Sequence, residues 1–146
     1  MKKLNKSKKR KKLAPHIVRQ RLIKYLDHLW SDLTKTIHGR ICWWCGSKVN
    51  IQSDHIANRW KFSTRWNVNN VAILCMGCHL FRKKREPAEW AKMVVGKIGQ
   101  DKYDEILQLS HSQEPTDLEQ VKKYLEGLRD EIQGVNINDT IGGKAA

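Results

Sequence analysis

The fold is decided by residues 42–79, which read CWWCGSKVNIQSDHIANRWKFSTRWNVNNVAILCMGCH. This stretch begins with one Cys-x-x-Cys pair, Cys42 with Cys45, and has a second, Cys75 with Cys78, just before its last residue, His79; the chain holds 4 cysteines in all. Two such pairs, with 29 residues between them, can place four thiolates tetrahedrally around one Zn²⁺ and leave no open position. The sequence therefore predicts a structural zinc site that braces a small domain.

The four cysteines are also compatible with roles other than a structural zinc site. In a short secreted protein they could form two disulfides, and taken alone they fit any zinc-ribbon or treble-clef module. No apolar block follows the basic start of the chain, as it would in a secretory signal, and no apolar run is long enough to cross a bilayer. We therefore expect zinc in a reducing cytoplasm and no membrane association.

Positive charge is concentrated in the front of the chain. Lys and Arg number 28 against 15 Asp and Glu, a net charge of +13. Residues 1–12 hold eight basic residues and no acid, residues 13–100 hold 15 basic and 5 acidic residues, and residues 101–146 hold 5 basic and 10 acidic ones. A polyphosphate partner explains a basic front half, because each neutralised phosphate releases condensed counterions. A basic run could also aid solubility or bind anionic lipid, but beside a metal site it favours nucleic acid.

The spacing of apolar residues predicts an α+β chain in five segments. Residues 1–13 are expected to be a disordered basic arm, and residues 14–40 contain an amphipathic helix over 16–37 that stops at Gly39. In the core, residues 41–86, we expect strands at 49–56 and 71–74, a loop at 57–69, and a helix from about Cys78 to Arg85. Residues 87–134 predict helices at 87–98, 101–109 and 116–132, the first beginning at Pro87 and the last closed by Gly134, and residues 135–146 predict a flexible tail.

One set of residues within the core resembles a known motif. Asp54, His55 and Ile56, then residues 69–79 (NNVAILCMGCH) and Lys83, are together similar to the motif of the HNH endonucleases. The resemblance covers residues 42–84 and includes both cysteine pairs, Asp-His, Asn and Cys-His in the order of that family. It implies a ββα-metal finger braced by the four-cysteine zinc. The flanking helices lie outside the motif and inherit nothing from it.

The resemblance implies roles for four residues. Asp54 and His79 would hold one divalent cation, and His55 would be the general base. Alternation along a strand agrees with this division, because neighbouring side chains point to opposite faces. Asn70 would be the central asparagine, which holds the two strands in register and orients the segment of His55. A one-residue slip would exchange it with Asn69, but the five-residue step to the second cysteine pair favours Asn70.

Elementary chemistry supports this interpretation. Hydrolysis of a phosphodiester needs an activated water, neutralised charge on the phosphorus centre and help for the leaving oxygen. A neutral imidazole near pH 7 can accept the proton of the water. A hard cation held by one carboxylate and one imidazole keeps most positions open for water and phosphate oxygens, which suits Mg²⁺ or Mn²⁺ better than Zn²⁺. We therefore expect a structural Zn²⁺ and a separate catalytic Mg²⁺ or Mn²⁺.

Two basic stretches are candidates for DNA contact. Residues 58–66 interleave cations with aromatic rings, a composition suited to phosphate contacts and to stacking or wedging against bases. Core packing is an equal alternative for the rings of Trp60, Phe62 and Trp66. In the helix that leaves the site, only some of four consecutive basic residues can face a phosphate backbone. The candidate contacts are Arg59, Lys61, Arg65, Arg82, Lys83, Lys84 and Arg85.

The expected function is metal-dependent cleavage of DNA by an HNH-type endonuclease, encoded by a phage and acting in recombination, packaging or homing in the bacterial cytoplasm. More narrowly, the run Thr64–Asn67 and the stretch Gly99–Asp104 are similar to phage recombination endonucleases of the NinG/Rap type. The acidic C-terminal helices are a poor DNA surface, so we expect them to cap the core, form a homodimer or bind a protein partner. The alternatives are a non-catalytic zinc module or degenerate finger that binds nucleic acid, and a disulfide-linked or lipid-associated basic protein.

Overall fold

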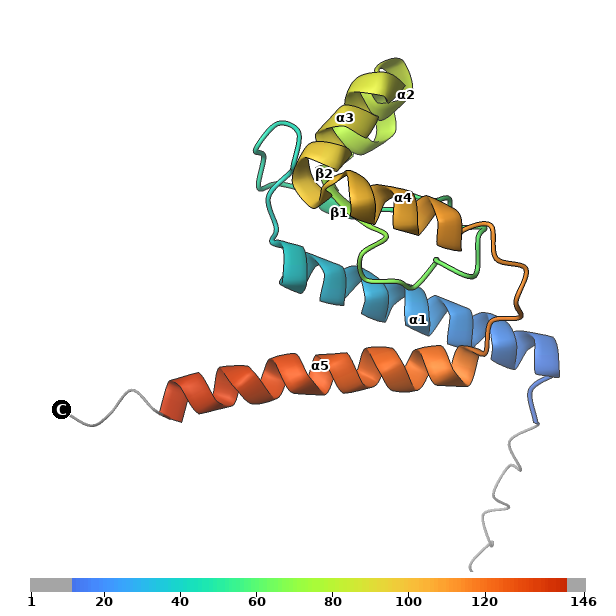
Figure 1. Ribbon diagram of the computed structural model, residues 1–146. Helices are drawn as coiled ribbons and strands as arrows, with labels where there is room; N and C mark the ends of the chain where they lie inside the picture. The colour runs from blue at the N-terminus through green and yellow to red at the C-terminus, as the bar shows by residue number, and fades with distance from the viewer. Residues whose placement is uncertain (1–11, 142–146) are drawn as a thin grey trace, which may run out of the picture.

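A pair of short antiparallel strands, β1 (Ile51–Asp54) and β2 (Ala72–Cys75), lies at the centre of the protein (Figure 1). The computed structural model describes the backbone of residues 12–141 and the side chains of residues 12–134. In this range the helices are α1 (Pro15–His38), α2 (Lys83–Arg85), α3 (Pro87–Ile98), α4 (Gln100–Leu109) and α5 (Leu118–Ile141). A π-helical segment, η1 (Cys78–Arg82), leads into α2. The α+β class that the sequence predicts is confirmed.

The strand β2 divides the core into two parts because both of its faces are buried. Val71, just before the strand, and Ile73 pack against α1 and α5, whereas Ala72 and Leu74 pack against α3 and α4. All four side chains have 0% exposure. Figure 1 accordingly shows the strands between α1 on one side and α3 with α4 on the other. A continuous apolar run is what a strand buried on both faces requires.

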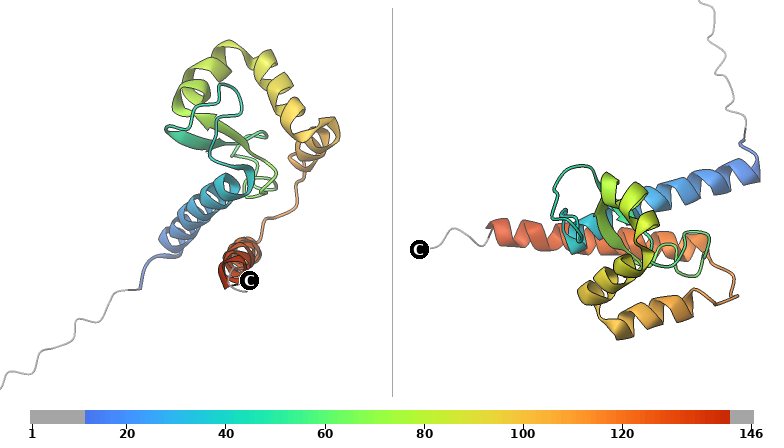
Figure 2. Two further views of the ribbon diagram at one scale, coloured as in Figure 1. Left: turned by 90° about the vertical axis from the view of Figure 1, so that its left-hand side faces the viewer. Right: turned by 90° about the horizontal axis from the view of Figure 1, so that it is seen from above.

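The two long helices, α1 and α5, run side by side in the same direction (Figures 1 and 2). Leu26, Trp30 and Leu33 of α1 meet Leu125 of α5 in one buried cluster. Spacings of three and four residues place these α1 side chains on a single stripe of the helix. The helix ends at Gly39, as predicted, and the φ of 85° there is a conformation that glycine adopts without a steric penalty.

The observed elements differ from the predicted ones mainly at their ends. The first strand is shorter than 49–56, because Asn50 takes a left-handed φ of 51° and the chain bends after Asp54. The last helix continues past the expected stop at Gly134 to Ile141. A glycine inside a helix costs only about 1 kcal/mol relative to alanine, so it weakens a helix without ending it. The predicted arm and the end of the predicted tail fall on residues 1–11 and 142–146, outside the described residues.

Among residues 12–141, no helix combines the length and the apolarity that crossing a membrane requires.

Candidate metal centre and active-site cleft

The four cysteines converge beside the sheet. Cys42 and Cys45 lie in the turn before β1, Cys75 ends β2, and Cys78 begins η1. Their sulfur atoms all lie within 4.8 Å of one another, and the sulfurs of Cys45 and Cys75 are 3.6 Å apart. Tetrahedral Zn–S bonds of about 2.3 Å place sulfurs about 3.8 Å apart. The predicted cluster is thus present, and its geometry can hold a metal ion; four thiolates are the donor set that Zn²⁺ prefers.

Backbone hydrogen bonds shape the first cysteine turn. The N–H of Gly46 donates to the carbonyl of Cys42 at 2.9 Å, and Gly46 has a φ of 76°. The N–H of Trp43 donates to the carbonyl of Ile73 at 2.8 Å, which fastens this turn to β2. Burial opposes ionisation of Cys42, but hydrogen bonds from neighbouring backbone N–H groups outweigh it and lower the pKa of that thiol to about 7. Cys42 is therefore partly thiolate near neutral pH. The hydrogen bond from the Ser47 backbone lowers the pKa of Cys45, but hydrogen bonding to Cys42 together with burial outweighs it and raises that pKa, and burial raises the pKa of Cys78.

A second group of polar residues lines a cleft of about 460 Å³. Its walls are Asp27, Trp30 and Ser31 from α1, residues 52–55 from β1 and its end, Asn58 and Arg59 from the following loop, and His79 and Lys83 from η1 and α2. The structure thus brings together Asp54, His55 and His79, the three residues to which the resemblance assigns cation binding and proton transfer.

Asp54 forms the buried floor of the cleft, with 6% exposure. The Lys83 ammonium lies 2.6 Å from its Oδ2, and His79 Nδ1 lies 3.4 Å from its Oδ1. Burial opposes ionisation of Asp54, but His79 and Lys83 outweigh it and hold the pKa of this carboxyl below its ordinary value. The Asp54 side chain is therefore a carboxylate at neutral pH.

The pair Asp54 and His79 fits a hard divalent cation. His79 Nδ1 is buried and has no hydrogen-bond partner within the described part of the chain. Adjacent ligands of an octahedral Mg²⁺, each at about 2.1 Å, lie about 3 Å apart. The 3.4 Å between Asp54 Oδ1 and His79 Nδ1 is close to this separation. Since Lys83 contacts the other carboxylate oxygen, Oδ1 stays available to a metal.

His55 is held on two sides at the edge of the same cleft. Its ring stacks on Trp30 with centroids 4.1 Å apart and an interplanar angle of 12°. Its Nε2 lies 2.9 Å from the carbonyl oxygen of Arg65. A carbonyl can only accept, so Nε2 carries the hydrogen and Nδ1 keeps a free lone pair. Burial lowers the pKa of His55, which keeps the ring neutral at pH 7.

The structure corrects the assignment of Arg65 as a DNA contact. Its side chain is 7% exposed, and its Nε and Nη2 donate to the two carboxylate oxygens of Asp27 at 2.9 and 2.7 Å. Its Nη1 donates to the carbonyl of Arg59 at 3.2 Å, and Trp66 Nε1 donates to Asp27 at 2.9 Å. A buried, bidentate guanidinium has no free face for a phosphate. Asp27 and Arg65 instead fasten the loop to α1, and the Arg65 carbonyl orients His55.

Asn70 joins the ends of the two strands. It is fully buried, its Nδ2 donates to the carbonyls of Ala57 at 3.1 Å and Thr64 at 2.9 Å, and its Oδ1 accepts from the N–H of Ala57 at 2.7 Å. Asn69, by contrast, is exposed. Asn70, just before β2, thus bonds to Ala57, which lies two residues beyond His55.

The other predicted DNA contacts lie on different surfaces. Arg59 is 56% exposed at the edge of the cleft, although it lies 3.3 Å from Asp27. Lys61 is exposed, and Lys83 is inside the cleft. Arg82 lies over the ring of Trp44 and pairs with Glu86 at 3.2 Å, and the exposed Lys84 and Arg85 border a separate hollow beside the cysteines. Only some of the run 82–85 can therefore face one phosphate backbone.

The aromatic rings of the loop differ in their exposure to solvent. Trp66, 3% exposed, belongs to the core, and Phe62 packs against the same cluster. Trp60 is 76% exposed. Core packing is thus confirmed for Trp66 and Phe62, and Trp60 is the ring of this loop that is accessible to a base.

No family model, curated protein or solved structure matches this chain.

Proposed function

We propose that this protein is a metal-dependent DNA endonuclease of the HNH type. The observation that carries the proposal is the single cleft in which Asp54 and His79 offer two cation ligands and His55 offers a neutral imidazole. The formal charge of +13 supports a polyanionic substrate. Arg59, which is exposed at the edge of the cleft, supports phosphate binding beside these groups.

Asp54 Oδ1 and His79 Nδ1 would hold Mg²⁺ or Mn²⁺, which supplies Lewis-acid stabilisation of the charge that develops on the phosphate. Lys83 keeps its ammonium on Oδ2 of Asp54 and so fixes the orientation of the carboxylate. The Arg65 carbonyl fixes Nε2–H of His55, and Nδ1 accepts the proton of the attacking water. Trp30 holds the plane of the imidazole ring and shields one of its faces from solvent.

Plasmid cleavage in Mg²⁺ or Mn²⁺ tests the proposal. His55→Ala removes a proton acceptor and no metal ligand, so cleavage should fall at least about 100-fold. Mn²⁺ binding, followed by paramagnetic broadening in NMR spectra, should persist in this variant. Asp54→Asn and His79→Ala should lose both cleavage and Mn²⁺ binding. His111→Ala replaces an exposed histidine outside the cleft and should change neither.

Cleavage by His55→Ala at the wild-type rate would refute the assignment of the base. Once cleavage is established, a panel of linear, nicked, flap and four-way DNA identifies the preferred substrate.

The Lys83 contact favours a second candidate, a zinc module that binds DNA without cutting it. An ammonium 2.6 Å from Oδ2 already neutralises Asp54 and leaves less electrostatic need for a metal cation. A wild-type protein that binds DNA but neither binds Mn²⁺ in the cleft nor cleaves any member of the panel would establish this candidate and exclude the first.

A further inference from the structure

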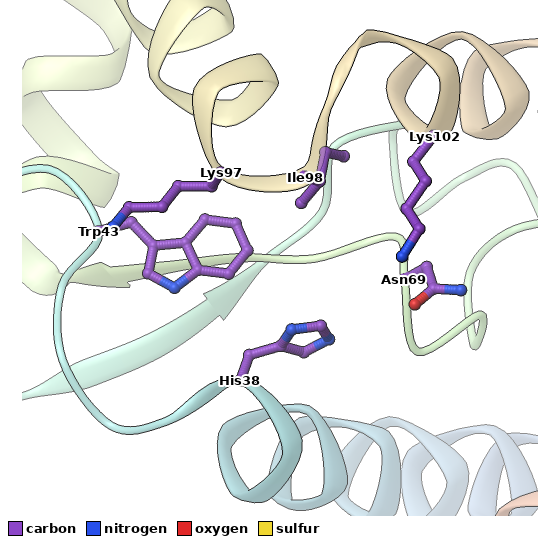
Figure 3. Close-up of a pocket in the computed structure, with 6 residues that line it drawn as sticks. All are labelled: His38, Trp43, Asn69, Lys97, Ile98 and Lys102. Carbon is purple, nitrogen blue, oxygen red and sulfur yellow. The ribbon is translucent and has the colours of Figure 1, made fainter.

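A second pocket, of about 380 Å³, shares no lining residue with the candidate active-site cleft. It is lined by His38, Trp43, Asn69, Lys97, Ile98 and Lys102 (Figure 3). Pockets of about 300–1,000 Å³ are typical of small-molecule sites. A ligand can therefore bind there without touching Asp54, His55 or His79.

The pocket is built where α1, the first cysteine turn and the α3–α4 connection meet. Lys97 and Lys102 lie on opposite sides of Gly99, whose φ of 86° allows the abrupt turn between the two helices. In Figure 3 the Lys97 side chain extends towards Trp43 and the Lys102 side chain extends towards Asn69. The two cationic side chains therefore lie at opposite ends of the opening, Lys97 towards the indole and Lys102 towards the amide. Both are exposed, so both contact one ligand between them only when they turn inwards.

The charge of the pocket is uncompensated. None of its lining residues is acidic, and neither Lys97 nor Lys102 has an ion-pair partner within residues 12–134. Two ammonium groups match an oxyanion that carries about two negative charges. A phosphate monoester carries about −1.5 to −2 at neutral pH, whereas a phosphodiester inside a DNA strand carries −1. The pair of lysines thus favours a terminal phosphate over an internal one.

The remaining residues suit the nucleoside attached to such a phosphate. The indole of Trp43 offers a surface on which a base can stack, and the Asn69 amide offers both a donor and an acceptor to a base edge. His38 steadies the indole: its ring lies edge-on to Trp43 at 5.8 Å, and its Nε2 donates to the carbonyl of Val68 at 3.0 Å. An inorganic phosphate would use the lysines alone and leave the ring and the amide without a role.

We propose that this pocket binds a nucleotide through its 5′-phosphate monoester, with the phosphate between Lys97 and Lys102 and the base against Trp43. The monoester can come from a free mononucleotide or from the 5′-phosphorylated end of a DNA strand. Both sources present the same chemistry to the pocket.

The test is an NMR titration of the zinc-loaded full chain with dAMP, deoxyadenosine and inorganic phosphate. The backbone N–H signals of Lys97, Lys102 and Asn69 should shift with dAMP, and dAMP should bind about tenfold or more tightly than either deoxyadenosine or inorganic phosphate. Two single-stranded oligonucleotides, with and without a 5′-phosphate, identify the source. A DNA end is the ligand if the 5′-phosphate strengthens oligonucleotide binding at this pocket. A free nucleotide is the ligand if dAMP binds there and the 5′-phosphate leaves oligonucleotide binding unchanged.

Replacing both Lys97 and Lys102 by alanine should weaken dAMP binding about tenfold or more, because two charge-assisted contacts are lost. Both side chains are exposed, so the variant should keep the wild-type spectrum elsewhere. Lys92→Ala is the matched control, since Lys92 is also on α3 but pairs with Glu89 at 2.8 Å and lies outside the pocket. The proposal is overturned if dAMP and deoxyadenosine bind equally, if the double variant binds dAMP as the wild type does, or if the shifts are confined to the cleft.

Discussion

Replacing Asn70 by alanine tests whether one buried amide holds the candidate active site together. The change removes three hydrogen bonds, two with the backbone of Ala57 at 2.7 and 3.1 Å and one with the carbonyl of Thr64 at 2.9 Å. The Asn70 side chain has 0% exposure, so the three backbone groups would lose their partner in a place that water does not reach. The unfolded chain does not contain these three hydrogen bonds, so the change destabilises the folded state alone.

The expected loss follows from these contacts. A buried hydrogen bond contributes about 1 kcal/mol net, and a buried polar group left without a partner costs about 1–3 kcal/mol. Three such groups give a decrease of about 3–4 kcal/mol in the free energy of unfolding, with the lower figure applying if the loop relaxes towards solvent. For a chain of this length a change of that size lowers Tm by about 10 °C.

Thermal unfolding of the zinc-loaded protein, followed by circular dichroism, measures this loss. Asn69→Ala is the matched control, because Asn69 is the same residue type one position earlier, with an exposed side chain. Its hydrogen bond to Asn67 Oδ1 is made by the backbone N–H and survives the change. We expect the control to stay within about 0.5 kcal/mol of the wild type. A Tm for Asn70→Ala that matches that of Asn69→Ala would refute the reasoning.

The same variant separates stability from positioning. Ala57 and Thr64 belong to the segment between His55 and Arg65, so the lost bonds loosen the contact that orients the imidazole. If the proposed function holds, cleavage by Asn70→Ala should be reduced even at low temperature, where the variant is still folded. Full cleavage by the folded variant would show that Asn70 stabilises the domain without positioning His55.

Two further predictions concern zinc and pH. Cys78→Ser should abolish stoichiometric zinc binding, measured by elemental analysis, and remove cooperative unfolding. Mild EDTA should stop any cleavage before it unfolds the protein. If unfolding and loss of cleavage occur at one EDTA concentration, the protein does not have two separate metal sites. Burial opposes ionisation of Asp27, but the bonds of its carboxylate with Arg65 and Trp66 outweigh burial and lower the pKa of Asp27. The Asp27 carboxylate therefore stabilises the fold above the unfolded pKa of about 4, and this contribution is lost as pH falls through the folded pKa. Thermal unfolding should therefore show a wild-type advantage over Asp27→Asn at pH 7 that disappears in strong acid, and an advantage independent of pH would exclude the ion pair as its source.

Local patterns predicted the helices, the strands and the cysteine cluster because each depends on neighbouring residues. The period of the apolar residues in α1, the proline that begins α3 and the spacing of the cysteine pairs are properties of short segments. The ends of β1 and α5 were predicted less well. They depend on the left-handed backbone of Asn50 and on the continuation of α5 through Gly134, and the local pattern predicts neither.

The parts of the site that the sequence did not predict come from long-range contacts. Asp27 and Arg65 are 38 positions apart, and no local signal in the sequence links them. Trp30 belongs to the apolar stripe of α1, and only the fold shows that its ring stacks on His55. The positive charge of Arg65 predicted a DNA contact. That prediction failed because composition shows the charge of Arg65 but not the distant carboxylate of Asp27 that neutralises it in the fold.

The two candidate metal sites are structurally linked, because η1 contributes a residue to each of them. Cys78, a member of the cysteine cluster, begins this segment, and the next residue, His79, faces Asp54 across the cleft. Lys83 follows four positions later, so His79 and Lys83 lie on the same side of the helical segment and contact the two oxygens of Asp54 separately. A metal that fixes Cys78 therefore also fixes the direction in which His79 points. If the proposed function holds, a metal at the cysteines would take no part in the chemistry, yet Asp54 and His79 should assume the geometry of cation ligands only after it binds.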